Sequence, residues 1–119
     1  MIVLCQLAHA QENKNPSTLS AKDFQQKTKE SNAVIIDVRS PGEFNSEHIS
    51  GASNINVESD QFGEQISKLD RSKSYLVYCG VGKRSALAAE LMRSAGFKKV
   101  FNLDGGLEAW KKENLPVTK

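Results

Sequence analysis

Cysteine is scarce in this chain of 119 residues, which contains only Cys5 and Cys79. The two cysteines form no CxxC pair and no cluster with the two histidines, so the ligand spacing of a metal site is absent. A disulfide between the N-terminus and the middle of a domain is disfavoured. We therefore interpret Cys79 as a lone thiol.

Long apolar runs and a large excess of charge of one sign are also lacking. No apolar run approaches the roughly 20 residues that a membrane span requires. The net charge of +2 is too small to make nucleic acid or an anionic membrane the main partner. The length leaves room for one domain, which can bury an ordinary core without a metal or disulfide. We expect a single-domain monomer with no membrane span.

The N-terminal segment 1–16 differs from the rest of the chain. Ile2 to Leu7 is mostly apolar, and Ala8-His9-Ala10 fits a signal-peptidase site, although a basic region before it is missing. Two interpretations stay open. One is the remnant of an export signal, which favours a periplasmic or exported protein. The other is a cytoplasmic protein whose first residues form a frayed terminus or a short apolar strand packed on the domain. The polar stretch from Gln11 to Thr18 predicts a linker into a domain that spans residues 17–119.

Apolar runs typical of buried strands alternate with helical patterns along this domain. The runs predict strands at 33–38, 75–78 and 100–103, with a shorter strand at 52–57. Helices are predicted at 21–29, 41–46, 61–69, from the loop after residue 79 to residue 95, and from the turn at 104–106 through Trp110. This alternation is typical of an α/β fold with a mainly parallel sheet.

Side-chain patterns predict how these helices begin and pack. Ser20 with Asp23, and Ser40 with Glu43, have the spacing of a capping box. In the long helix before Gly96, apolar spacing predicts a buried face formed by Leu87, Ala88, Leu91, Met92 and Ala95.

Cys79 stands where a reactive thiol can be stabilised. It directly follows a buried strand, and in parallel sheets ligands bind beyond the carboxyl ends of the strands. The loop that it begins contains Gly80 and Gly82 and leads into a helix, so successive backbone N–H groups can point to one centre. The positive end of the helix adds to this, and both effects lower the pKa of a thiol. The alternative is a small buried hydrophobic residue, which suits the strand interior better than a glycine loop.

Two cations follow the glycine loop directly. Lys83 and Arg84 lie at the first turn of the predicted helix, where acidic side chains are normally favoured, and the next acid is Glu90. A bound anion would relieve this conflict. The alternative is that both side chains simply extend into water, where screening removes the cost.

These residues resemble signatures of the rhodanese-domain sulfurtransferase family. The pattern Cys-x-x-Gly-x-Arg-Ser is similar to the family's active loop, and it occurs here at Cys79, Gly82, Arg84 and Ser85. Other segments resemble the first and last signatures of the family, namely Asp37-Val38-Arg39, Glu43-Phe44, His48-Ile49, Gly51-Ala52, and Asp104-Gly105-Gly106 with Trp110. The resemblance covers residues 17 to 117 and departs at Glu47, where Gly is usual, and at Asn56, where Pro is common.

The resemblance implies a single rhodanese-like domain whose five-stranded sheet has helices on both faces. It also implies a double displacement in which Cys79 takes a sulfur atom from a small anionic donor such as thiosulfate. The resulting persulfide passes it to cyanide, a thiol or a protein cysteine, and no cofactor or metal is needed. The persulfide would be bound by the loop residues Gly80, Val81, Gly82, Lys83, Arg84 and Ser85.

Four further residues are expected to support the loop. Asp37, Arg39 and Glu43 are expected to form a charge network that fixes a neighbouring segment. His48 can act as a general acid or base, although a structural hydrogen bond is favoured. Trp110 is expected in the core.

Two other functions fit parts of the pattern. Cysteine phosphatases and arsenate reductases place five residues between Cys and Arg, whereas four residues separate Cys79 from Arg84 here. A smaller loop suits one sulfur atom better than a tetrahedral oxyanion. A non-catalytic binding or redox-sensing module of the same fold is the other alternative, although such modules often lack the cysteine.

Overall fold

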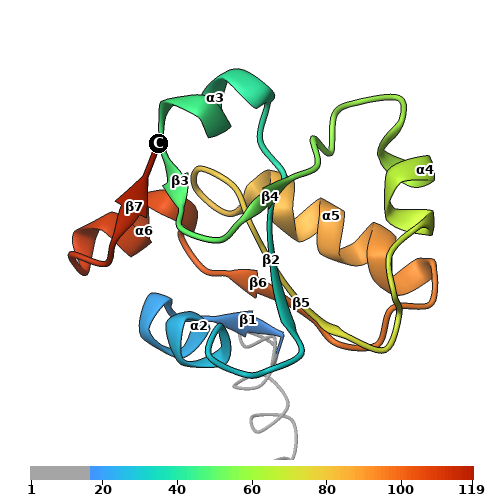
Figure 1. The fold of residues 1–119 in the computed structure, drawn as a ribbon, viewed down its shortest axis with the longest axis horizontal. Coiled ribbons are helices and arrows are strands. Elements are labelled where there is room, and N and C mark those ends of the chain that lie inside the picture. The colour runs from blue at the N-terminus through green and yellow to red at the C-terminus, as the bar shows by residue number, and fades with distance from the viewer. Residues whose placement is uncertain (1–16) are drawn as a thin grey trace, which may run out of the picture.

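A computed structural model describes residues 17–119 of the chain (Figure 1). The predictions for segment 1–16, including Cys5 and the export-signal remnant, fall outside the described residues.

The domain is organised around a five-stranded parallel sheet with the strand order β1-β6-β5-β2-β4. Its strands are β1 (Thr18–Leu19), β2 (Ala33–Asp37), β4 (Ser53–Asn54), β5 (Ser74–Tyr78) and β6 (Val100–Leu103). The apolar runs of β2, β5 and β6 occupy the middle of the sheet, and every residue of β5 is buried. The predicted parallel α/β fold is confirmed.

The edges of the sheet differ from the sequence prediction. The expected strand at 52–57 is reduced to Ser53–Asn54, although Ile55 and Val57 still donate backbone hydrogen bonds to Asp37 and Val38. The end of the predicted linker is instead strand β1, which pairs with β6. This strand was not predicted because its two residues are too few to show an alternation of side chains.

Helices cover both faces of the sheet, as predicted (Figure 1). On one face, α4 (Phe62–Ser67) and α5 (Lys83–Ser94) pack on Tyr75, Val77 and Cys79. On the other face, α2 (Ala21–Lys27) and α6 (Gly106–Lys112) pack on Leu76 and Tyr78. Side chains alternate between the two faces along β5. This alternation directs the side chain of Cys79 towards α5.

The buried face of α5 is rotated from the predicted one. Leu87 and Leu91 are 51% and 43% exposed, and Ala95 is exposed as well. Ala88 and Met92 are buried as predicted, and Ser85 and Ala89 are buried beside them. The prediction was wrong for Leu87, Leu91 and Ala95, because it centred the buried face on the two leucines. The small side chains of Ala88 and Ala89 face the sheet, and this orientation places Ser85 beside Cys79.

The helix starts follow the capping patterns to different degrees. Helix α3 (Pro41–Ser46) has the full capping box between Ser40 and Glu43. At α2, the Ser20 hydroxyl oxygen accepts the Asp23 N–H at 3.2 Å, but within residues 17–119 the Asp23 carboxylate does not accept the Ser20 N–H in return. Asp is one methylene shorter than the Glu or Gln that completes a capping box.

A small ribbon outside the main sheet was not predicted. Strand β3 (His48–Ile49) pairs antiparallel with β7 (Val117–Thr118), which brings the end of the described chain beside α3 (Figure 1). Each strand has only two residues, too few for a recognisable alternation of side chains. Within residues 17–119, no helix combines the length and the apolar character needed to cross a membrane.

Candidate active site at Cys79

Cys79 directly follows the central strand β5, and its loop leads into α5. Gly82 is the N-cap of α5 and has a φ of +105°, a left-handed conformation that glycine adopts without steric cost. The helix has no side-chain cap. Its first backbone N–H groups are therefore available to a group held in the loop.

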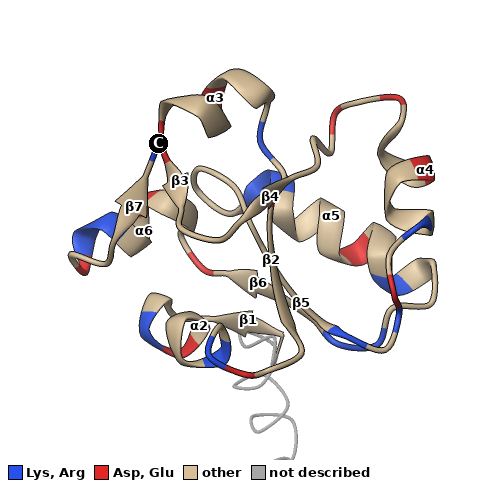
Figure 2. Cartoon of the chain, viewed as in Figure 1, with Lys and Arg blue, Asp and Glu red and all other residues tan. Residues whose placement is uncertain are grey.

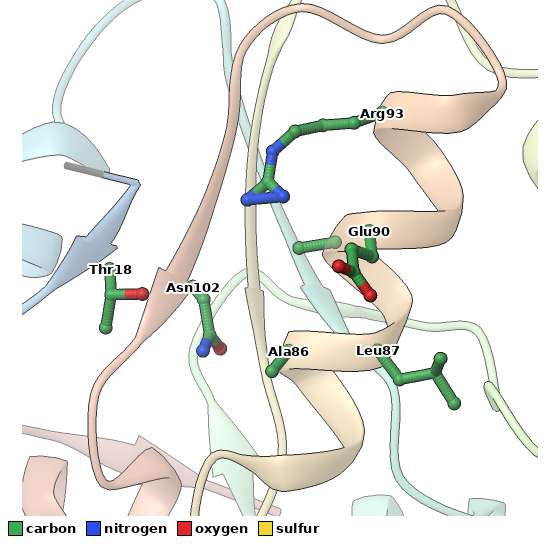
Figure 3. A pocket seen from close by; sticks show the side chains of 7 residues that line it. Thr18, Ala86, Leu87, Glu90, Arg93 and Asn102 are labelled. Carbon is green, nitrogen blue, oxygen red and sulfur yellow. The ribbon is translucent and has the colours of Figure 1, made fainter. Parts of the chain in front are cut away.

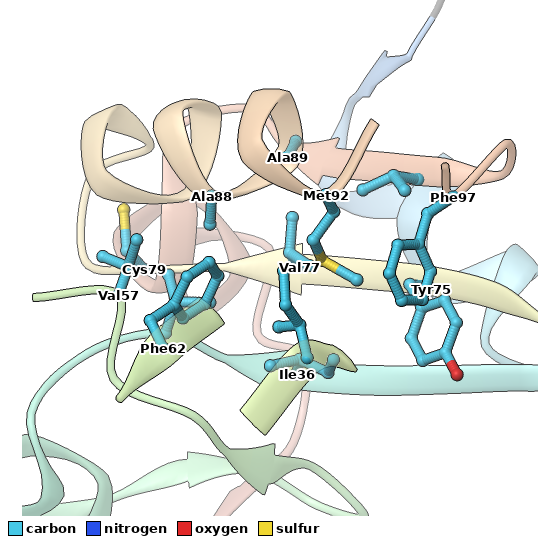
Figure 4. Packing of buried hydrophobic residues seen from close by; sticks show 13 residues of the cluster. Ile36, Val57, Phe62, Tyr75, Val77, Cys79, Ala88, Ala89, Met92 and Phe97 are labelled. Atoms are coloured by element: carbon cyan, nitrogen blue, oxygen red, sulfur yellow. The ribbon is translucent and has the colours of Figure 1, made fainter. Parts of the chain in front are cut away.

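Three donors converge on the sulfur of Cys79. The backbone N–H groups of Gly82 and Ser85 lie 3.1 and 3.3 Å from Sγ, and the Ser85 hydroxyl lies 3.3 Å from it. Cys79 is fully buried at one end of the apolar cluster under α5, with its sulfur directed towards the first turn of that helix (Figure 4). The sulfur is thus hydrogen-bonded by the loop, as the glycine pattern predicted, and it is also enclosed by apolar side chains.

The hydrogen bonds lower the pKa of the Cys79 thiol. Burial acts first and raises the pKa, because it disfavours the charged thiolate. The hydroxyl and backbone N–H of Ser85, followed by the N–H groups of Gly82 and Val81, outweigh this effect and leave the pKa below that of an ordinary thiol. The loop is therefore suited to hold an anionic sulfur.

Two backbone hydrogen bonds join helix α6 to the Cys79 loop. The backbone N–H of Leu107 donates to the Cys79 carbonyl at 2.8 Å, and that of Glu108 donates to the Gly80 carbonyl at 3.1 Å. This approach requires glycine: a Cβ at Gly106 would lie 2.5 Å from the Gly80 carbonyl and 2.6 Å from the Cys79 carbonyl oxygen. The Asp104-Gly105-Gly106 segment thus allows α6 to pack closely against the loop.

The two loop cations have different surroundings. Arg84 reaches across to α3, where it forms hydrogen bonds of 2.8 and 3.1 Å with the Glu43 carboxylate. Mainly through this contact, the pKa of Glu43 falls to about 2. Lys83 is exposed at the start of α5. The other Lys and Arg residues are spread over several elements rather than gathered on one surface (Figure 2).

The expected network of Asp37, Arg39 and Glu43 is divided into two pairs. Arg39 forms a buried ion pair with Asp37 at 2.8 Å and also donates to the Glu47 carbonyl. Glu43 pairs with Arg84 instead. Asp37 and Arg39 are only two residues apart at the end of β2, so these two side chains pair with each other. Helix α3 directs Glu43 towards the Cys79 loop instead. The two pairs brace the segment on one side of the site.

His48 and Trp110 occupy structural positions. His48 Nδ1 lies 2.8 Å from the Phe44 carbonyl oxygen, and its ring stacks on the Phe44 ring with centroids 3.7 Å apart. Trp110 is buried in the core, as predicted, and donates to the Pro116 carbonyl. Glu47, which replaces the usual Gly, has an extended backbone that any residue can adopt.

Sequence reasoning missed one residue at the site. Asn102 lies on β6 and is buried, and its Oδ1 accepts a hydrogen bond from the Ser85 hydroxyl. A polar side chain within an apolar strand could have revealed it, because buried polar groups almost always have a partner.

Comparisons with known proteins show which sequences and structures this chain resembles. The sequence model of the family described as "Rhodanese-like domain" matches residues 20–113. The chain is 35% identical over 96 residues to "Thiosulfate sulfurtransferase GlpE" of Shewanella oneidensis, covering 81% of this chain and 93% of that protein. It is 34% identical over 109 residues to the uncharacterized protein slr1261 of Synechocystis, which covers 86% of this chain and 56% of that protein. The chain thus spans about half of slr1261. The crystal structure of a rhodanese-related protein from Thermoplasma volcanium has a TM-score of 0.76 and 31% identity, covering 85% of this chain and 96% of that one.

Proposed function

Because this chain belongs to the family of rhodanese-like domain proteins, we propose that it is a sulfurtransferase that carries sulfur as a persulfide on Cys79. The observation that carries the proposal is the convergence of the Gly82 and Ser85 N–H groups and the Ser85 hydroxyl on Sγ. Preorganised donors stabilise negative charge at the position where it develops in a reaction. These donors are aimed at the Cys79 thiolate, which is consumed in the first displacement and restored in the second.

The proposed reaction has two displacements. The Cys79 thiolate attacks the outer sulfur of thiosulfate, a new S–S bond forms, and the old S–S bond breaks as sulfite leaves with its electron pair. Cyanide or a thiolate then attacks the outer sulfur of the persulfide. The S–S bond to Cys79 breaks, and the electron pair returns to Sγ as a thiolate. Covalent catalysis of this kind divides one difficult transfer into two easier ones.

The loop residues would act at different stages. Lys83 is exposed and adds positive charge at the entrance to the loop, where it would attract an anionic donor. Arg84 is bound to Glu43, so we assign it to holding the loop against α3. The N–H groups between Gly80 and Ser85 would bind the persulfide. Asp37, Arg39 and His48 contribute by fixing the neighbouring backbone.

A phosphatase or arsenate reductase is less well supported. Those reactions require an arginine to clamp the tetrahedral oxyanion, whereas the Arg84 guanidinium makes two hydrogen bonds with Glu43. A non-catalytic module accounts less well for donors aimed at a sulfur atom whose pKa is lowered.

The proposal is tested by the mass of the intact protein after incubation with thiosulfate. We expect a gain of about 32 Da, the mass of one sulfur atom in a persulfide. Cys79→Ser should show no gain, whereas Cys5→Ser should show the same gain as the wild type. Addition of cyanide should reverse the gain and release thiocyanate.

The same preparations distinguish the alternatives. Hydrolysis of an aryl phosphate without any mass gain would support the phosphatase and refute the sulfurtransferase. A folded protein with neither the mass gain nor the hydrolysis, tested with thiosulfate and with a low-molecular-weight persulfide as donors, would support the binding module.

A further inference from the structure

The Ser85 hydroxyl lies within hydrogen-bond distance of three acceptors at the site. Asn102 Oδ1 is 2.5 Å from Ser85 Oγ, while Cys79 Sγ and the Gly82 carbonyl oxygen are each 3.3 Å from it. A hydroxyl has one proton to donate and two lone pairs that accept. It can therefore serve only one of these three acceptors as a donor at any time.

The distances indicate which acceptor receives the proton in the resting state. The contact with Asn102 is the shortest, so the hydroxyl donates to Oδ1. The lone pairs of Ser85 Oγ are then free to accept the S–H of a neutral Cys79. When the thiol loses its proton, the backbone N–H groups of Gly82 and Ser85 already donate to the thiolate, and rotation of the hydroxyl from Asn102 to Sγ adds a third donor.

We propose that Asn102 is a positioning residue that sets the direction of the Ser85 hydroxyl and thereby the balance between neutral and ionised Cys79. Its carbonyl competes with the sulfur for one proton. When Asn102 holds the hydroxyl proton of Ser85, Cys79 loses one of its donors and the neutral thiol is favoured; when the hydroxyl turns to Sγ, the thiolate is favoured. The proposal rests on the proposed function for its catalytic meaning, but the ionisation of Cys79 can be measured without sulfur transfer.

The surroundings of the Asn102 amide allow its hydrogen bond to Ser85 to be removed on its own. Asn102 lines a pocket of about 330 Å³ between β1, β6 and α5 (Figure 3). Within residues 17–119, the Asn102 amide nitrogen has no hydrogen-bond partner, so Ser85 is the one side-chain contact that orients the amide. Replacement of Asn102 therefore removes the bond to Ser85 without disconnecting any other side-chain hydrogen bond.

The charged groups around the sulfur stay in place in such a variant. Arg84 on α5 interacts with a charged Cys79, and its own partner is Glu43 on α3. Asp37, the last residue of the neighbouring strand β2, and Arg39, just after that strand, neutralise each other. A change in the ionisation of Cys79 can then be attributed to Ser85.

The test is the thiolate absorbance of Cys79 measured against pH. A Cys5→Ser background makes Cys79 the single thiol. Asn102→Leu keeps the size of the side chain but removes the acceptor, so the pKa of Cys79 should fall by about 0.5 to 1. Asn102→Asp should raise the pKa, because an anionic acceptor holds the hydroxyl more strongly and repels the thiolate. If Asn102→Leu acted only by making the surroundings of Cys79 less polar, it would raise the pKa of Cys79. The proposal predicts the opposite, a fall in that pKa.

Ser85→Ala is the control that isolates the coupling. It should raise the pKa of Cys79, and in its presence Asn102→Leu should have no further effect. The proposal would be overturned if Asn102→Leu alone raised the pKa of Cys79 or left it unchanged. It would also be overturned if Asn102→Leu lowered that pKa equally with Ser85 present and in the Ser85→Ala background. Thermal unfolding of each variant identifies those that remain folded, and the thiosulfate mass gain, measured in parallel, tests the proposed function separately.

Discussion

The contact between Gly106 and the Cys79 loop can be tested by adding a single methyl group. In Gly106→Ala, the new Cβ would lie 2.5 Å from the Gly80 carbonyl, whereas ordinary contact begins at 3.4 Å, so the loop must move by about 0.9 Å. Misplacement of a reacting group by about 1 Å can cost about 10²-fold in rate. We therefore expect sulfur transfer per folded molecule to fall about 10- to 100-fold. Steric overlap should also lower the free energy of unfolding by about 1–3 kcal/mol, and the φ of +62° adds roughly 1 kcal/mol for a residue with a Cβ.

Gly105→Ala provides a matched control for this experiment. Its φ of +75° imposes similar backbone strain, but its Cβ would lie 2.7 Å from the Ala109 Cβ, within α6 rather than against the loop. Both variants should lose stability, and only Gly106→Ala should lose activity. The assay is the initial rate of thiocyanate formation at a temperature at which both proteins are folded, with urea unfolding in parallel. Wild-type activity in a folded Gly106→Ala protein would refute the proposal that α6 fixes the position of the Cys79 loop.

Two further predictions concern stability. The pKa of Glu43 is about 2 instead of 4.5, so its ionised form stabilises the folded protein above pH 4.5, and this contribution is lost as the pH falls towards 2. Because the Glu43 side chain is 41% exposed, we expect Glu43→Gln to lower the free energy of unfolding by only about 1 kcal/mol at neutral pH and not at all near pH 2. If urea unfolding showed the same difference between variant and wild type at both pH values, the ion pair with Arg84 would not be its cause. Met92→Ala should cost about 2–5 kcal/mol, and Leu91→Ser less than about 0.5 kcal/mol; the reverse order in thermal unfolding would contradict the burial of α5.

The central strands were predictable because both of their faces are buried. The apolar runs at β2, β5 and β6 carry this signal directly, and the Ser40 capping box fixed the start of α3. The edge strand β1 and the ribbon of β3 and β7 were not predictable, because two residues cannot show a period. The rotation of α5 depends on contacts with the sheet and with Cys79, which lie far away in the sequence.

At the site, local sequence predicted the converging backbone N–H groups but not their side-chain partners. The two glycines and the following helix were enough to anticipate donors around Cys79. The pairing of Arg84 with Glu43 spans 41 positions, and that of Ser85 with Asn102 spans 17. Partners at such distances are determined by the packing of strands and helices, which a pattern within one segment does not contain.

The complete burial of the Cys79 sulfur means that chemistry must be preceded by an opening of the protein. The first two carbonyls of the loop are anchored to α6, so the opening must occur farther along, where Val81 is exposed and Gly82 can change its backbone angles easily. Reagents then meet the sulfur only in the open fraction of molecules, and their apparent rate constants scale with that fraction. Dissolved oxidants are restrained in the same way, so burial of the sulfur protects the reduced thiol.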